Sequence, residues 1–260
     1  MLIPFYKFHG TGNDFIIISK IKSQNIDLNT DIIKQLCNPN FGIGADGLMT
    51  ILPSNNYDFE MKYYNSDGKE GSMCGNGGRC IVAFAKIMNI IKDETIFLAT
   101  DGAHTAIVDE NNIVKLKMID VTEIKKYDDG YFLDTGSPHF VQFTNNLDNI
   151  NIEKTGEDLR FDNRFAPFGT NVNFAEIRND YILFKTYERG VEKETLSCGT
   201  GAVATAIASV VQYENIPKSV NLQAKGGKLN IYFSKTEQNS FTNIWLEGET
   251  KFVFNGEISL

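Results

Sequence analysis

The sequence predicts an α+β fold made of two domains that resemble each other. Three observations predict it: short motifs recur at a nearly constant separation, alternating apolar and polar residues predict strands throughout, and each half carries one long apolar segment with helical spacing. Strands joined mostly by short turns would then form, in each half, a mainly antiparallel sheet or barrel wrapped around a central helix.

The repeated motifs predict the domain organisation. Four motifs of the first half return in the same order about 125 positions later, a period too long for a solenoid and typical of two pseudo-symmetric domains. The stretch at 118–131 is polar and charged, as expected of a crossover. We therefore place the domains at 1–118 and 119–260, and expect a final strand at 250–260 to pack back on the first domain. The paired motifs are 12–15 with 137–140, 41–42 with 168–169, 72–77 with 196–201, and 99–102 with 224–227.

Apolar periodicity predicts the individual elements. The segment 75–91 places Ile81, Phe84 and Met88 at helical spacing, which predicts a helix with one apolar face. The segment 199–212 is rich in Ala and Val almost all round, which predicts a deeply buried helix. Strands with one buried face are predicted at 58–65, 113–119, 228–233 and 241–246.

Composition limits the classes of function. A net charge of −8 over 260 residues argues against nucleic acid as the main partner, because phosphate binding needs clustered Lys and Arg. No run approaches the roughly 20 apolar residues that span a bilayer, and the N-terminus lacks the pattern of a secretion signal. We therefore expect a cytoplasmic protein without a membrane partner, whose four cysteines are thiols. Without CxxC spacing, and with only three histidines, a structural zinc site is disfavoured.

Two of the cysteines stand at corresponding positions of the repeat. Cys74 and Cys198 each precede a glycine-rich turn that opens a predicted helix. The first amide N–H groups of a helix have no partner inside it, and the helix dipole is positive there. A thiol at this position can have its pKa lowered from about 8.5 into the range of about 3.5–7.5, and the same N–H groups can bind an anion. Glycines that let a ligand approach the backbone stand at 75, 77, 78, 199 and 201.

The duplication suggests a two-base reaction. If the halves face each other, a substrate carboxylate could lie between the two helix N-termini, with one sulfur on either face of its α-carbon. Cys74 and Cys198 would then remove a proton from one face and return one to the other, which inverts the centre. One cysteine must start as thiolate and the other as thiol. Backbone donors would stabilise the charge that develops on the carboxylate.

Other interpretations of these residues remain open. A cysteine near a helix start is usually a small buried hydrophobe, and this is the interpretation we favour for Cys80; Cys37 has no motif around it. The string at 199–204 matches Gly-x-Gly-x-x-Ala, but no acidic residue follows about twenty positions later, which disfavours a dinucleotide site. A thiol redox sensor is an alternative of a different class, since cysteines of low pKa oxidise readily.

The motifs together resemble the diaminopimelate epimerase family along almost the whole chain. The resemblance implies a two-domain, pseudo-symmetric fold, no pyridoxal phosphate or other cofactor, no metal, and a homodimer. It also implies interconversion of LL- and meso-diaminopimelate, which supplies lysine and peptidoglycan precursors. The motifs that carry it are 7–15, 42–47, 65–68 and 74–80 in the first half, and 136–139, 170–174, 187–190 and 197–201 in the second.

The resemblance also implies roles for individual residues. It makes Cys74 and Cys198 the acid–base pair, with His139 and Glu188 tuning the thiols. Residues implied to contact the substrate are Asn13, Asn65, Asn171, Glu188 and Arg189, and those implied to surround its reacting carboxylate are Gly75, Asn76, Gly199 and Thr200. Arg189 could bind a carboxylate of the substrate bidentately.

Two positions depart from some family members. Gly47 stands where some carry Gln, and Ser137 stands where many carry Asn, so side-chain contacts at these two positions are in doubt. The nearest rival is a proline or hydroxyproline racemase, but those usually place His where Asn76 stands and lack the Tyr-Glu-Arg-Gly string found at 187–190. The related phenazine-type isomerases lack the cysteine pair.

Overall fold

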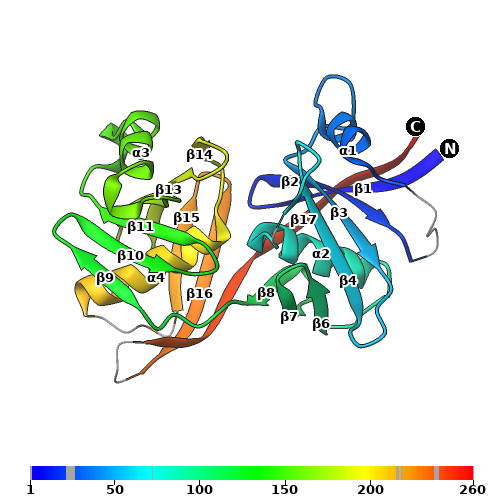
Figure 1. Cartoon of the computed structure of the whole chain (residues 1–260). Helices are drawn as coiled ribbons and strands as arrows, with labels where there is room; N and C mark the ends of the chain where they lie inside the picture. The colour runs from blue at the N-terminus through cyan, green and yellow to red at the C-terminus, as the bar shows by residue number, and fades with distance from the viewer. Residues whose placement is uncertain are drawn as a thin grey trace. The chain divides into compact units, whose positions relative to one another are not determined.

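The protein divides into two compact units (Figure 1). The computed structural model describes residues 2–21, 27–71, 73–214, 217, 219–236 and 240–259. Unit 1 comprises Met1–Leu116 with Gly248–Leu260, and unit 2 comprises Lys117–Glu247. Ser72, part of one predicted repeat motif, and Leu260, the end of the predicted final strand, lie outside the described residues.

Unit 1 is a closed barrel around a helix. Strands β1, β2, β3, β4, β6, β7 and β8 pair in that order, and the last strand, β17, pairs with both β8 and β1 and so closes the ring. The described part of this unit contains helices α1 (Thr30–Cys37) and α2 (Gly75–Ile87). The strands are β1 (Leu2–Gly10), β2 (Asn13–Ser19), β3 (Gly47–Leu52), β4 (Phe59–Asn65), β5 (Glu70–Gly71), β6 (Glu94–Ala99), β7 (Gly102–Val108), β8 (Ile113–Lys117) and β17 (Phe241–Ser259).

Among its described residues, unit 2 contains the first part of β17 and eight further strands. Its helices are α3 (Ile152–Arg160) and α4 (Gly199–Tyr213), with short 3₁₀ turns at Leu147–Asn149 and Asn163–Phe165. The strands are β9 (Ile124–Tyr127), β10 (Gly130–Asp134), β11 (Pro138–Phe143), β12 (Asn171–Ile177), β13 (Ile182–Glu188), β14 (Lys193–Thr195), β15 (Ser219–Ala224) and β16 (Gly227–Lys235).

The two units have the same order of strand pairing. In unit 1, β2–β3 is parallel, β3–β4 and β4–β5 are antiparallel, β4–β6 is parallel and β6–β7 is antiparallel. The same sequence of parallel and antiparallel pairs runs through β11, β12, β13, β14, β15 and β16. The prediction of an α+β fold with two similar, mainly antiparallel halves is therefore confirmed.

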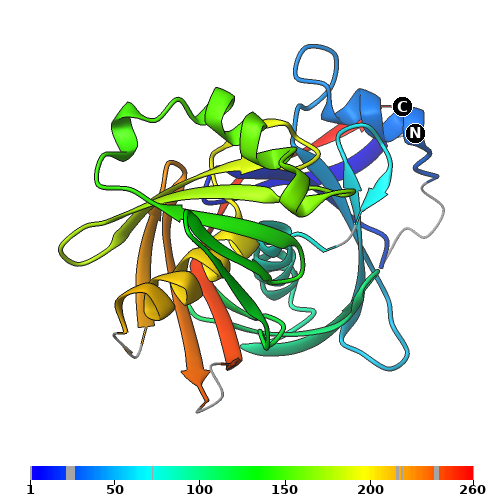
Figure 2. The same ribbon diagram turned by 60° about the vertical axis from the view of Figure 1, so that its left-hand side comes forward.

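One buried helix lies against the strands in each unit. All residues of α2 from Gly75 to Ala85 are buried, and the helix contacts β1, β2, β3 and β7. Helix α4 is buried along most of its length and contacts six strands from β10 to β16; Figure 2 shows it between the green and orange strands of its unit. Because both helices are enclosed, their first turns are held rigidly by the sheets around them.

Two details differ from the prediction. Helix α2 ends at Ile87 rather than at 91, because Asn89 adopts a left-handed conformation (φ 56°) and the N–H of Ile90 bonds to the carbonyl of Ala85, the hydrogen-bond pattern of a Schellman cap. The stretch predicted as a crossover at 118–131 contains β9, which pairs with β10. Both central residues of this four-residue strand are exposed, so no apolar alternation marks it.

Candidate functional site

Cys74 is the residue immediately before α2, at the position that caps the helix. Its backbone is extended (φ −93°, ψ 130°), and its carbonyl accepts the N–H of Gly78 at 2.7 Å, the first hydrogen bond of the helix. The side chain is half-buried, and Sγ lies 3.7 Å from Oδ1 of Asn13. The thiol therefore sits where the unpaired N–H groups and the positive end of the helix dipole favour a thiolate.

Asn13 connects the thiol of Cys74 with the rest of unit 1. Its Oδ1 accepts a hydrogen bond from Nδ2 of Asn76 at 3.2 Å, and its own Nδ2 donates to Asp46 at 2.7 Å. Asp46 also accepts the backbone N–H of Asp14 at 3.2 Å. The amide of Asn13 is thus held in one orientation, with its oxygen toward Cys74. Asn13, Cys74 and Asn76, three residues named from the sequence, are brought together.

Arg79 is a buried charged residue that contacts Asn76. The sequence analysis assigned it no role. Its guanidinium is fully buried and donates to Oγ1 of Thr11 at 3.2 Å and to Oδ1 of Asn76 at 3.1 Å. Within the described structure its Nε and second terminal nitrogen have no hydrogen-bond partner. Burial lowers the pKa of Arg79, while the nearby thiols of Cys80 and Cys74 act to raise it. An incompletely bonded cation therefore lies close to the Cys74 sulfur.

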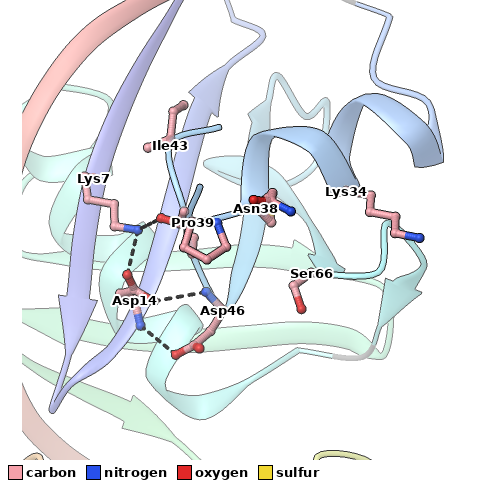
Figure 3. A pocket seen from close by; sticks show the side chains of 11 residues that line it. Lys7, Asp14, Lys34, Asn38, Pro39, Ile43, Asp46 and Ser66 are labelled. Carbon is pink, nitrogen blue, oxygen red and sulfur yellow. Dashed lines mark hydrogen bonds and ion pairs between the residues drawn. The ribbon is translucent and has the colours of Figure 1, made fainter. Parts of the chain in front are cut away.

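A pocket of about 630 Å³ lies in unit 1 beside Asn13. Figure 3 shows Lys7 pointing at Asp14, with a 2.6 Å ion pair, and Lys7 also donates to the carbonyl of Gly44. Asp46 lines the pocket and bonds Asn13, so the pocket adjoins the Cys74 group. The lining residues are Lys7, Asp14, Lys34, Cys37, Asn38, Pro39, Ile43, Gly44, Ala45, Asp46 and Ser66.

Asn65 ends β4 and lies opposite Gly47 on the neighbouring strand β3. Its backbone N–H bonds to the carbonyl of Lys69, and its carbonyl accepts the N–H of Gly68, which closes a turn at a left-handed glycine (φ 84°). Its side chain is exposed. The turn role is therefore visible in the structure, and the predicted substrate contact stays a prediction.

Cys198 occupies the corresponding position before α4. Its side chain is buried, and Sγ lies 3.4 Å from the N–H nitrogen of Gly201 and 3.4 Å from Oγ1 of Thr200. The N–H of Ala202 bonds to its carbonyl at 2.9 Å. In both units, therefore, a cysteine is the residue immediately before a buried helix, and the second helical residue (Asn76 or Thr200) is polar.

The hydroxyl of Thr200 lies between His139 and the Cys198 sulfur. His139 is fully buried on β11, and its Nδ1 is 2.9 Å from Nδ2 of Asn173, whose Oδ1 is fixed by the hydroxyl of Thr186. Since the amide nitrogen donates, Nδ1 is the acceptor and Nε2 carries the proton. Nε2 is 2.9 Å from Oγ1 of Thr200, whose own proton is then available to the Cys198 sulfur. His139 therefore reaches this thiol through Thr200.

Burial, with a smaller contribution from the positive charge of Arg189, lowers the pKa of His139 to about 3. The unfolded chain, with an ordinary pKa near 6.5, binds a proton that the folded protein excludes. We expect the free energy of unfolding to fall below pH 6.5, by at most about 1.4 kcal/mol per pH unit from this group. Urea unfolding would measure the free energy of unfolding at pH 7 and at pH 5. The loss between these two pH values should be smaller for His139→Gln than for the unsubstituted protein. An equal loss in both proteins would contradict this prediction.

Asn171, Arg189 and Ser137 lie around the same histidine. Asn171 is buried at the start of β12; its Nδ2 donates to the carbonyl of Pro138 and to Oγ of Ser137, and its Oδ1 accepts the N–H of Arg189 at 2.8 Å. Both amide protons are thus used inside the protein. Ser137, one of the departures from the family pattern, is 3.0 Å from Nε2 of His139. The structure therefore brings together Cys198, Thr200, His139, Asn171 and the backbone N–H of Arg189.

Glu188 ends β13, and Arg189 begins the turn that follows. Both are half-buried, and the carbonyl of Glu188 accepts N–H groups from Val191 and Glu192 across this turn. Gly190 within it is left-handed (φ 89°). The turn thus fixes the backbone from which both side chains project.

The glycines of the two helix starts have a structural role beyond the one predicted. A Cβ at Gly201 would lie 2.5 Å from Oδ1 of Asn173, and one at Gly78 would lie 2.9 Å from the sulfur of Met73. A Cβ at Gly77 would lie 3.1 Å from the sulfur of Met49. At these three positions the space is filled by side chains of the protein, which lets the helices pack tightly.

Gly201→Ala is therefore expected to lower the free energy of unfolding by about 1–3 kcal/mol, because the new methyl group forces Asn173 away from His139. Gly77→Ala provides the matched variant in unit 1, where the neighbour is the flexible Met49 side chain. Its effect should be smaller. Chemical denaturation of both variants tests the difference, and an equal or larger loss for Gly77→Ala would contradict this account.

The remaining cysteines are buried thiols. Cys80 is fully buried in α2, as predicted, and burial raises its pKa; burial also raises the pKa of Cys37 to about 12. In the described part of the chain, no cluster of three or more His, Cys, Asp or Glu side chains could hold a metal ion. Among the described helices none is both long and apolar enough to cross a membrane.

Solved structures with the same fold come from several kinds of protein. A phenazine biosynthesis protein of the PhzF family from Bacillus anthracis superposes with a TM-score of 0.79 at 14% identity, covering 100% of both chains. A hydroxyproline epimerase from Agrobacterium vitis superposes with a TM-score of 0.70 at 13% identity, covering 100% of this chain and 93% of that one. At these identities the likeness shows the fold alone.

The amino-acid sequence is much closer to other proteins. A protein from Flavobacterium psychrophilum named diaminopimelate epimerase is 47% identical over 98% of this chain and 100% of its own length. One of the same name from Chlorobaculum tepidum is 38% identical over 96% of this chain and 99% of its own. The sequence profile described as diaminopimelate epimerase matches residues 5–122 and 131–253. The chain therefore belongs to the diaminopimelate epimerase family, a family of amino-acid isomerases.

Proposed function

We propose that this protein interconverts LL- and meso-2,6-diaminopimelate with Cys74 and Cys198 as its acid–base pair and without a cofactor. One observation carries the proposal: in a chain of this family, both units place a cysteine immediately before a buried helix whose second residue (Asn76 or Thr200) is polar. An enzyme that inverts a carbon centre by taking a proton from one face and returning one to the other needs an acid–base group on each face. A duplicated thiol site supplies them.

In the proposed reaction one cysteine is a thiolate and removes the α-proton, while the other is a thiol and protonates the opposite face. The sulfur that gave its proton becomes the thiolate, so the charge is conserved and the roles exchange for the reverse reaction. The carbanion-like transition state places charge on the substrate carboxylate. Helix N-termini stabilise such charge through fixed N–H donors that need no rearrangement during the reaction.

The residues around the thiols have proposed roles in binding. Gly75, Asn76, Gly199 and Thr200 form the first turns of α2 and α4 and would hold the reacting carboxylate. The other amino-acid end of the substrate would be held by the remaining polar residues, with Arg189 binding its carboxylate and oxygen acceptors binding its ammonium. These residues are Asn13, Asn65, Asn171, Glu188 and Arg189.

His139 and Glu188 are proposed to tune the thiols. His139 supports this through its hydrogen bond to Thr200, because a hydroxyl that accepts from Nε2 directs its own proton at the Cys198 sulfur and favours the thiolate. Glu188 ends β13, directly before Arg189. A carboxylate near a cysteine raises the pKa of the thiol and would favour its protonated form.

The setting of this reaction follows from its substrate. We propose that the product serves lysine and peptidoglycan precursor synthesis, that the enzyme works in the reducing cytoplasm, where its thiols persist, and that it forms a homodimer. Sedimentation of the purified protein would show a species of twice the chain mass of 29.1 kDa if the dimer forms.

Proton NMR in heavy water tests the reaction directly. LL-diaminopimelate incubated with the reduced protein and no added cofactor should lose its α-proton signal as the meso isomer appears. Exchange with proline or hydroxyproline, but not with diaminopimelate, would keep the two-thiol mechanism and overturn the substrate. The absence of exchange with all three would favour the redox sensor, in which Cys74 and Cys198 cycle between thiol and oxidised forms.

A further inference from the structure

Tyr63 lies on the same face of the unit 1 sheet as residues named for substrate binding. On adjacent strands Met49 is opposite Tyr63, and Gly47 is opposite Asn65. Cross-strand partners project to the same face, and so do residues two positions apart along one strand. Tyr63 and Asn65 therefore share a face.

This face is the one that packs against the start of α2. Phe15 on β2 pairs with Gly47 and lies on the same side, and so does Asn13 two positions before it. A Cβ on Gly77, in the first turn of α2, would lie 3.1 Å from the Met49 sulfur and 3.6 Å from both Cζ of Phe15 and Cβ of Cys74. Tyr63 and the residues that pack beside Cys74 therefore lie on the same face of the sheet.

The ring of Tyr63 and the backbone of Tyr64 fill the space that a side chain at position 47 would need. A Cβ built on Gly47 would lie 2.6 Å from Cε2 of Tyr63, 2.7 Å from the carbonyl oxygen of Tyr64 and 3.0 Å from the hydroxyl oxygen of Tyr63. On the other side, a Cβ on Gly71 would lie 3.1 Å from Cδ1 of the same ring. The ring meets Phe15 edge to face at 6.1 Å and 77°. Two glycines and one aromatic neighbour therefore fix its position.

We propose that the Tyr63 hydroxyl contacts the substrate and takes the place of the amide side chain that some family members carry at position 47. This inference rests on the proposed function. The Tyr63 hydroxyl lies where a side chain at position 47 would begin. The phenol hydroxyl both donates and accepts hydrogen bonds, as an amide does. The half-buried ring lies near Asn65, since a Cβ on Gly71 would be 3.1 Å from both Cδ1 of Tyr63 and Nδ2 of Asn65. Its partner is a carboxylate or ammonium of the non-reacting end of the amino acid.

Tyr64, the next residue on β4, provides a matched control. Its side chain projects from the opposite face of the strand and packs against the core cluster that contains Ile33, Leu36 and Leu48. Its pKa is raised by burial and by Glu70. The two tyrosines thus differ in the face they occupy while sharing strand, residue type and hydroxyl.

Tyr63→Phe removes one oxygen atom and keeps the ring. We expect the KM for LL-diaminopimelate to rise about tenfold while kcat changes less than about threefold, since a hydrogen bond to a charged group is lost from binding. Tyr64→Phe should leave KM unchanged. An unchanged KM for Tyr63→Phe, with or without a fall in melting temperature, would overturn the inference, because the hydroxyl would then be structural only.

A larger truncation gives a second measurement. Tyr63→Ala should raise KM at least as far as Tyr63→Phe. Gly47→Gln should lower the melting temperature, because its Cβ clashes with the Tyr63 ring and with the Tyr64 carbonyl oxygen. If the unsubstituted protein epimerises no diaminopimelate in the NMR assay, the proposed function fails first, and the two failures are distinguishable.

Discussion

Replacing either Cys74 or Cys198 with alanine is expected to reduce epimerisation by at least roughly 10³-fold, because each thiol serves one face of the α-carbon and general acid–base groups contribute on this scale. Both cysteines stand immediately before buried helices, and neither is a large core side chain, so the fold should persist. Turnover is measured by NMR in heavy water and folding by circular dichroism. Near-normal turnover in either variant would rule out the two-base assignment.

Cys37→Ala is the control for this experiment. Cys37 is a buried thiol with a pKa raised to about 12, so it cannot act as a base near neutral pH. The variant should keep its activity. The two cysteine-to-alanine variants can also be tested for exchange of the α-proton with solvent deuterium in the absence of inversion. If one variant exchanges only the LL isomer and the other only the meso isomer, the result identifies which face of the α-carbon each thiol serves.

Arg79→Met is expected to lower kcat about tenfold or more at neutral pH and to move the acidic limb of the activity profile to higher pH by on the order of one unit. The guanidinium charge lies near Cys74, and its removal makes the thiolate harder to form. The free energy of unfolding should change by less than about 2 kcal/mol, since Met fills a similar volume and the buried cation is only partly hydrogen-bonded.

Arg79→Lys separates charge from shape in the same position. It keeps the positive charge but loses the forked geometry that reaches both Thr11 and Asn76. Its pH profile should stay closer to that of the unsubstituted protein than the profile of Arg79→Met does. An acidic limb that is the same in all three proteins would mean that Arg79 orders the loop and has no effect on the thiol.

The sequence predicted the duplicated fold because the features that create it are local. Helix α4 is apolar almost all round, and this composition is typical of an enclosed helix. The end of α2 could not be predicted by periodicity, since it depends on the left-handed conformation of Asn89. Strand β9 was missed because its two lysines are exposed on a strand with little buried surface. Apolar periodicity in a sequence predicts only those helices and strands that bury one of their faces.

The candidate site was predictable where a motif marks it and not where distant strands build it. Cys74 and Cys198 stand in similar sequence motifs, and the repetition of this motif identifies them. Asp46, Arg79 and Asn173 lie inside the family motifs, but those strings do not show that they hold Asn13, Asn76 and His139 in place. The contacts of Asp46 and Asn173 depend on pairing between segments far apart in the sequence, which periodicity does not report. For Arg79, a charged residue inside the apolar run of α2 was a further sign.

The last strand has a consequence for synthesis on the ribosome. Strand β17 closes the barrel of unit 1 by pairing with β1, from the pair Leu2 and Ser259 to the pair Gly10 and Thr250. The first strand can therefore form these pairs only after the last residues of the chain have been made. Unit 2 is one continuous segment, Lys117–Glu247, and is complete earlier. Domains usually fold in order from the N-terminus. Here the middle of the chain can finish first, and a nascent chain stalled before Gly248 should protect unit 2 from protease while unit 1 remains open to cleavage.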